Sequence, residues 1–273
     1  MNEKTREELL LELQKLNKAQ IRIKRRSTFL LSVIAMLVLI TGTLAWFTLN
    51  SFASIENLTM EITTGVDLRV DMVSHGSDIK QYQKVITNEM INSYLSKYNT
   101  SIAQQRLDPV TTTNGISFVN QKGATRNPNE TSYLEFQCYF IASRDMWVHL
   151  STDPGTTDYE ATSVTTTETG TMADVVKAVR VSFEDNGAAA IYEPNKGTPV
   201  NGQTTFDLTT PMQYSNSTRL FHLNELEPKL ITIRLWADGE DPECDDDVQQ
   251  ANLTVKMLFS GTDDANVPYS DIQ

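Results

Sequence analysis

Cysteine and histidine are scarce in this sequence, and their scarcity removes most site chemistry from consideration. The 273 residues include two cysteines and three histidines, which are His75, His149 and His222. None of these histidines lies in the H-E-x-x-H spacing that places two imidazoles around zinc. The sequence also contains no G-x-S-x-G elbow, no glycine-rich phosphate loop and no Cys-x-x-Cys pair. We therefore expect a protein that is not an enzyme. His149 falls on the polar side of a strand pattern, which predicts a solvated or cross-strand role.

The two cysteines leave two readings open. Cys138 and Cys244 are 106 positions apart and fit no metal-binding spacing. In an oxidising cell envelope they could form a disulfide with each other. Alternatively, each is a small buried apolar residue.

Lysine and arginine are concentrated at the N-terminus, and acidic residues outnumber them in the rest of the chain. Residues 1–26 hold eight Lys or Arg against four Glu, a net charge of +4, and the next cation after Arg26 is Arg69. Since the whole chain carries −12, the remainder carries −12 − 4 = −16. This balance argues against nucleic acid as a partner and suits an extracytoplasmic domain that meets divalent cations.

A hydrophobic run without charge extends from Thr28 to Leu49. As a helix it would be about 30 Å long, enough to cross a bilayer. The basic residues before it place the N-terminus in the cytoplasm and the later residues outside. Small residues precede a cut between Ala45 and Trp46, which is a signal-peptidase pattern. The run is therefore either a retained anchor, leaving a single-pass membrane protein, or a cleaved signal, releasing the protein to the cell surface.

We divide the chain into three parts on these grounds. Residues 1–26 form a cytoplasmic basic segment, 27–50 a transmembrane or signal helix, and 51–273 an extracytoplasmic domain. Within the first part, residues 5–23 show apolar positions at helical spacing. That helix either continues into the membrane span or meets a partner: a second copy, a cytoplasmic protein or the inner leaflet.

Period-two alternation beyond the membrane predicts a mainly β domain. Residues 55–63 and 66–72 read as two strands around a turn, and residues 78–98 as one inserted helix with Asp78 as its N-cap. Five further runs alternate in the same way: 134–140, 146–150, 179–183, 231–235 and 253–259. We expect an antiparallel sandwich with one solvated face on each sheet, interrupted by surface loops at 151–171 and 184–204.

An acidic loop follows the fourth of these runs. Seven of the ten residues from Asp238 to Asp247 are carboxylates. Crowded oxygen ligands suit calcium, although the EF-hand order is absent. The predicted ligands are Asp238, Glu240, Asp241, Asp245, Asp246 and Asp247. The alternatives are a solvated acidic turn that protects a sheet edge, or a cap formed by residues 245–247 for a short helical turn running into Val248.

Two segments resemble a known family. The junction G-T-L-A-W-F-T at 42–48 and the segment G-V-D-L-R-V at 65–70 are similar to the start of the TasA/camelysin group of secreted proteins from Gram-positive bacteria. Segments 178–183, 191–195, 231–236 and 239–244 are similar to an arrangement in surface proteins of clostridial bacteria that share this junction.

The resemblance implies a jelly-roll-like sandwich that is exported, cut between Ala45 and Trp46 and, in some members, assembled into matrix fibres. In those members a freed N-terminal segment completes the sheet of the next subunit, and here that segment would lie within 46–63. The charged leader is longer than in the secreted members, and the insert at 78–98 is larger. Camelysin-type proteolysis is not carried over because no protease constellation can be placed on these residues.

Two functions follow as expectations. The first is a non-enzymatic structural protein of the cell surface or extracellular matrix, biofilm matrix included. The second is a single-span anchored binding or sensing module whose outer domain takes a ligand or calcium.

Overall fold

The computed structural model describes residues 24, 28, 31–34, 36, 53–63, 68–151, 162–199, 203–208 and 213–269. The chain divides into two compact units, Met1–Asn50 and Ser51–Gln273. The described residues of the first unit are helical. No helix within the described ranges is both long enough and apolar enough to span a bilayer. The helix expected at 5–23 and the cleavage positions Ala45 and Trp46 lie outside the described residues.

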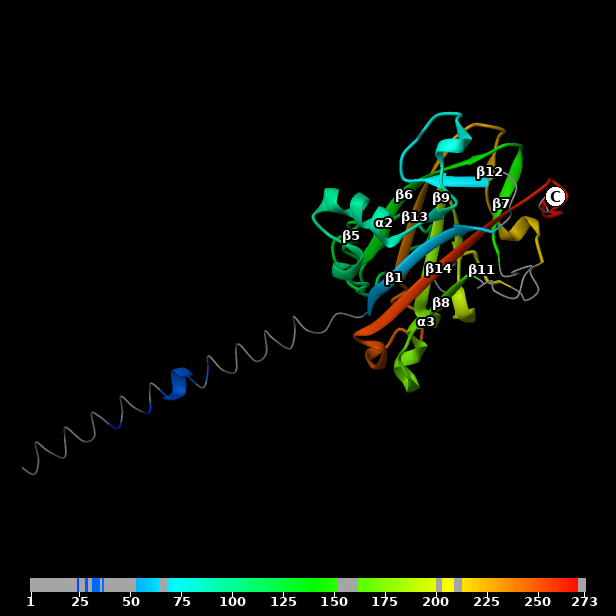
Figure 1. Ribbon diagram of the computed structural model, residues 1–273. Helices are drawn as coiled ribbons and strands as arrows, with labels where there is room; N and C mark the ends of the chain where they lie inside the picture. Colours follow the sequence, from blue (N-terminus) through cyan, green and yellow to red (C-terminus); the bar gives the residue numbers. More distant parts are fainter. Residues whose placement is uncertain are drawn as a thin grey trace, which may run out of the picture. The chain divides into compact units, whose positions relative to one another are not determined.

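The second unit is mainly β, as the alternation predicts, and contains two six-stranded sheets (Figure 1). The first sheet has the order β12, β7, β14, β1 and β3, with β8 also paired to β14: Arg219–Leu223, Met146–Leu150, Ala251–Thr262, Ala53–Ile62, Val85–Ile86 and Ser163–Thr165. The second has the order β11, β10, β9, β13, β6 and β2: Thr205–Phe206, Ala188–Tyr192, Val179–Asp185, Lys229–Ala237, Tyr133–Ala142 and Leu68–Asp71. A small hairpin pairs β4 (Phe118–Val119) with β5 (Thr125–Arg126).

The two large sheets pack face to face through aromatic side chains. The ring of Phe259 on β14 lies 5.2 Å from that of Phe140 on β6 and 5.8 Å from that of Phe183 on β9, measured between centroids. These residues fall on the apolar positions of the predicted runs. All five runs form strands, which confirms that part of the prediction.

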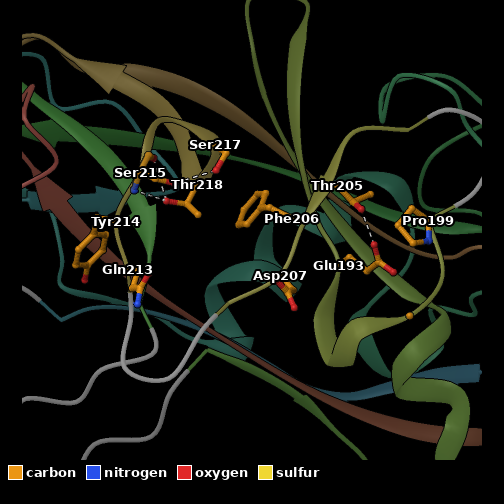
Figure 2. A pocket seen from close by; sticks show the side chains of 11 residues that line it. Glu193, Pro199, Thr205, Phe206, Asp207, Gln213, Tyr214, Ser215, Ser217 and Thr218 are labelled. Carbon is orange, nitrogen blue, oxygen red and sulfur yellow. Dashed lines mark hydrogen bonds between the residues drawn. The ribbon is translucent and has the colours of Figure 1, made fainter.

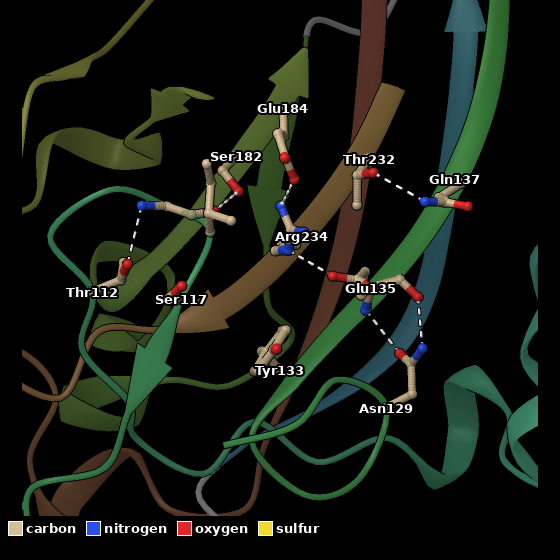
Figure 3. Close-up of polar contacts among 12 residues, drawn as sticks. Thr112, Ser117, Asn129, Tyr133, Glu135, Gln137, Ser182, Glu184, Thr232 and Arg234 are labelled. Atoms are coloured by element: carbon tan, nitrogen blue, oxygen red, sulfur yellow. Dashed lines mark hydrogen bonds and ion pairs between the residues drawn. The ribbon is translucent and has the colours of Figure 1, made fainter. Parts of the chain in front are cut away.

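The outer face of the second sheet is solvated only in part. Around Arg234 it is polar: this side chain pairs with Glu135 at 2.7 Å and with Glu184 at 2.6 Å, and Gln137 donates to Thr232 at 3.2 Å (Figure 3). Nearer β4 the same face carries a second buried cluster: Val110, Phe118, Tyr133, Ile191 and Trp236. The expectation of one fully solvated face per sheet is therefore wrong for this sheet.

The pairing is mixed rather than antiparallel throughout. β1 runs parallel to β14, and β10 runs parallel to β11. The two strands expected at 55–63 and 66–72 form as β1 and β2, but they do not pair with each other, because β1 belongs to the first sheet and β2 to the second. The turn expected between them falls on residues 64–67, outside the described residues. Alternation identifies a strand and its buried face, but it does not identify the partner strand.

The single helix expected at 78–98 is broken into shorter elements. Asp78 does act as an N-cap, accepting from the Lys80 amide at 3.3 Å, but it caps only a 3₁₀ turn, Ile79–Gln81. β3 then pairs antiparallel with β1 through Ile86 and Met60. The α-helix is α2, Asn88–Leu95. Tertiary pairing of Ile86 thus overrides the helical spacing of the apolar residues.

Both expected surface loops contain strands. β8 lies within 151–171, although residues 152–161 are outside the described ranges, and β10 lies within 184–204. Each of these strands is short, three and five residues. Short runs without clear alternation carry little signal in the sequence.

Candidate functional site

The first strand of the domain supplies a full row of side chains to the core. Ile55, Leu58, Met60 and Ile62 of β1 are all at most 4% exposed. Each large apolar side chain buried in this way contributes about 1.5–3 kcal/mol. β1 is therefore an integral part of the core, and its withdrawal would leave an apolar groove beside β14.

β1 is held differently along its two edges. On one edge, nine residue pairs join it in parallel to β14, from Ala53 with Ala251 to Ile62 with Phe259; the two strands run side by side in Figure 1. The other edge, among the residues that the structure describes, meets only short pieces of chain. The Leu107 amide donates to the Ala53 carbonyl at 2.9 Å, and the two residues of β3 pair near the far end. Most of the hydrogen bonding of β1 thus comes from the last strand of the chain.

β1 contains a bulge, and the Asn88 side chain, which no sequence motif marks, hydrogen-bonds to it. The register with β14 shifts between Ile55 and Asn57. The Asn88 side chain accepts from the Leu58 amide at 2.8 Å and donates to the Asn57 side chain at 2.5 Å. Asn88 is the first residue of α2, so this helix start fixes the strand in place. An asparagine at a helix start is common, and nothing in its spacing indicates this contact.

The acidic loop is organised around a buried arginine of the second sheet. Arg180 of β9 is fully buried, and its guanidinium pairs with Asp241 and lies 3.2 Å from Glu193. It also donates to the Thr198 carbonyl at 3.2 Å, while the Thr198 amide donates to Asp241 at 3.2 Å. This Arg180 network ties residues 193–198 and the acidic loop to one strand. The buried guanidinium has lost its hydration, which the two carboxylates and the backbone carbonyls around it replace.

Asp238 lies at the edge of the Arg180 network. It is fully buried, accepts from the Gln203 side chain at 3.2 Å and accepts from the Glu240 amide at 3.2 Å. Burial raises the pKa of this carboxyl to about 6, because the charged form loses water contact. Asp238 and Asp241, two of the six predicted calcium ligands, therefore serve as internal partners of protein groups.

Among the remaining predicted ligands, Asp245 stabilises a local turn. The Asp245 side chain accepts from the Asp247 amide at 2.9 Å and so caps a 3₁₀ turn, Asp246–Val248, which is the predicted capping alternative. Asp245, Asp246, Asp247 and Glu240 are exposed. Within the described part of the chain, no three His, Cys, Asp or Glu side chains are grouped so as to hold a metal ion. Calcium binding stays a prediction, which calorimetry with calcium would test.

Both cysteines are free thiols in the structure. Cys138 is buried in β6 with its sulfur 3.4 Å from that of Met72, and Cys244 is half-buried in the acidic loop. Burial raises the pKa of both thiols well above the ordinary value. The disulfide that the sequence left open is not formed here, and Cys138 fits the reading of a small buried apolar residue.

His149 is buried rather than solvated, and its role is a cross-strand one. Its ring nitrogens lie 3.1 Å from the Thr218 hydroxyl and 3.0 Å from the Thr262 hydroxyl. Burial lowers the pKa of this imidazole from about 6.5 to about 4. The folded protein therefore holds His149 neutral at pH values where the unfolded chain protonates it.

This burial predicts a loss of stability in acid. Between about pH 6.5 and pH 4 the unfolded state binds the extra proton, so the free energy of unfolding falls as pH falls. We expect His149 alone to account for a loss of about 3 kcal/mol by pH 4. Denaturant unfolding of wild type and His149→Gln at pH 7.5, 5.5 and 4.5 measures this, and the difference between them should shrink in acid. His222→Gln, at a half-exposed position, is the control; an equal acid effect in that variant would contradict the assignment.

Comparisons with known proteins do not place this chain in a family. No protein-family model, no curated protein and no solved structure matches it.

Proposed function

We propose that this protein is a non-enzymatic structural protein of the cell surface or extracellular matrix, exported across the cytoplasmic membrane, whose β1 is exchanged between copies during assembly. The observation that supports this best is the position of β1. In the sequence β1 comes shortly after the predicted membrane or signal segment, 27–50. It pairs in parallel with β14. It is joined to the rest of the domain only through the chain after Ile62. Its withdrawal would break its pairings with β14 and β3 but would leave the chain connections between the other strands in place.

Exchange preserves the contacts that β1 makes. A β1 from a second copy would present the same apolar row, Ile55, Leu58, Met60 and Ile62, to the same groove. The net change in free energy is therefore small, and the main obstacle is the barrier to withdrawing β1 from its own core. Main-chain hydrogen bonds to β14 would supply affinity, and the buried row would fix the register.

The resemblance to the TasA/camelysin group supports the same proposal, including a jelly-roll-like arrangement and a donated segment within 46–63. Retention through residues 27–50 gives a single-pass protein with its C-terminal domain outside. Cleavage between Ala45 and Trp46 gives a free subunit. In both cases the proposed partner is a second copy of this chain.

A designed disulfide distinguishes exchanged from unexchanged subunits. The Ser54 hydroxyl donates to the Asn252 side chain at 2.7 Å, across the register of β1 and β14. In the full chain carrying Ser54→Cys, Asn252→Cys and Cys244→Ser, oxidation links β1 to whichever β14 it pairs with. We expect cell-surface material to give a ladder of covalent oligomers on non-reducing gels. Oxidation before assembly should trap monomers and prevent oligomers.

The matched control is a pair on two internal strands. Gln137 and Thr232 face each other on β6 and β13 with their side chains 3.2 Å apart. Gln137→Cys with Thr232→Cys, in the same Cys244→Ser background, should give only a linked monomer under every condition. If Ser54→Cys with Asn252→Cys likewise gives monomers alone from cell-surface material, strand exchange is wrong.

A further inference from the structure

A cavity of about 500 Å³ lies beside the Arg180 network, between the segment that leads into β11 and the turn that precedes β12. Figure 2 shows Phe206 projecting between two groups of polar side chains. Its lining includes Glu193, Thr205, Phe206, Asp207, Ser217 and Thr218. A cavity of about 300–1,000 Å³ suits a small-molecule ligand.

Buried polar side chains define both sides of this cavity. On one side Glu193 is 3% exposed; one of its oxygens accepts from the Thr205 hydroxyl at 2.5 Å and the other lies 3.2 Å from Arg180. On the other side Thr218 is buried, with its hydroxyl 3.1 Å from the ring of His149. Buried Arg180 contacts the Glu193 side chain, and buried His149 contacts the Thr218 side chain. These two side chains are therefore pre-organised, which reduces the conformational entropy lost when a ligand binds.

The chemistry of the lining selects against anions. Among the described side chains that line the cavity, two are carboxylates and none is a lysine or arginine. Arg180, which Glu193 shares with Asp241, offsets part of the charge of Glu193 and so lowers what a cation gains from it. Five lining residues carry hydroxyl groups: Thr205, Tyr214, Ser215, Ser217 and Thr218. Thr205 and Thr218 already donate their hydroxyl protons to Glu193 and to the Ser215 carbonyl, so they offer acceptors to a ligand. The Ser215 and Ser217 hydroxyls pair with each other, which leaves one of the two with a proton to donate.

We propose that this cavity binds a neutral polyhydroxylated ligand of the size of a mono- or disaccharide. A sugar ring has hydroxyls around its edge and C–H groups on its faces. The ring of Phe206 offers an apolar surface to such a face, while Ser217 and Asp207 lie at the edges of the cavity, within reach of its hydroxyls. The proposal is independent of strand exchange, since none of these residues belongs to β1 or β14.

Saturation-transfer NMR on the full chain, in a detergent without a sugar headgroup, tests this proposal. The probes are glucose, galactose, N-acetylglucosamine, maltose and lactose, with gluconate as the anion and ethanolamine as the cation. We expect transfer to at least one neutral sugar and none to gluconate. No transfer to any of the five sugars, or transfer to ethanolamine alone, would overturn the proposal.

A variant whose new side chain fills the cavity tests whether the transfer to sugars arises there. Ser217 is exposed at the cavity wall, so Ser217→Trp should fill the space without disturbing the core, and we expect at least a tenfold loss of transfer. Ser93→Trp, at an exposed position of α2, is the matched control and should keep the full signal. Melting temperatures of both variants verify folding. Sugar transfer that persists in a folded Ser217→Trp variant would place binding elsewhere and refute the assignment.

Discussion

Replacing Arg180 by methionine should destabilise the domain by about 3–5 kcal/mol, because Asp241 and Glu193 would stay buried without their cation. Denaturant unfolding at neutral pH measures the change, and an unaltered dependence on denaturant would show that the folded state stays compact. The same substitution should also loosen residues 193–198, which Arg180 holds through the Thr198 carbonyl. Adding Asp241→Leu to Arg180→Met should recover part of the loss, because it removes one of the orphaned charges.

Arg234→Met is the matched control for this experiment. Arg234 also pairs with two carboxylates, but Glu135 and Glu184 are 18% and 20% exposed and regain water when the guanidinium is removed. We expect a cost of about 1 kcal/mol there. Equal effects of the two arginine substitutions would contradict the idea that the Arg180 network depends on burial.

Phe259→Ala should cost about 3–5 kcal/mol, because this ring fills the space between the two sheets. Its ring lies against those of Phe140 and Phe183, which come from two different strands of the opposite sheet. Truncation leaves a cavity that neither sheet can close without moving as a whole. Denaturant unfolding gives the size of the effect, and Phe259→Leu should cost less because most of the volume remains.

Val267→Ala provides the comparison for a surface position. Val267 is 57% exposed in the segment after β14, so its truncation should change stability by less than about 0.5 kcal/mol. A Phe259→Ala cost no larger than this would show that the two sheets are not packed as described.

The sequence predicted the strands that have one regular buried face. Phe136, Cys138 and Phe140 alternate over a long run, and they lie in the core as expected. Prediction failed where long-range pairing decided the conformation. Ile79, Ile86 and Met90 have helical spacing, yet Ile86 lies in a strand because β1 offers it a partner.

The Arg180 network shows the same limit of prediction from the sequence at the candidate site. In Val179-Arg180-Val181 the alternation correctly sends Arg180 to the outer face of the second sheet. It does not reveal that residues 193–198 and the acidic loop cover that face. The sequence therefore predicts Asp241 as a calcium ligand among neighbouring carboxylates, while its partner in the structure is a cation 61 residues away in the sequence.

The parallel pairing of β1 with β14 also determines how the domain resists mechanical force. If the leader is held and the C-terminal end is pulled, tension enters β1 at Ala53 and β14 at Thr262, at opposite ends of the paired strands. The hydrogen bonds between them are then loaded together in shear, rather than opened one at a time from an end. The short tail that folds back through Tyr269 onto Gly261 would peel away first and leave this shear-loaded pair intact. Forced extension is governed by the unfolding rate, so the shear arrangement favours a load-bearing subunit.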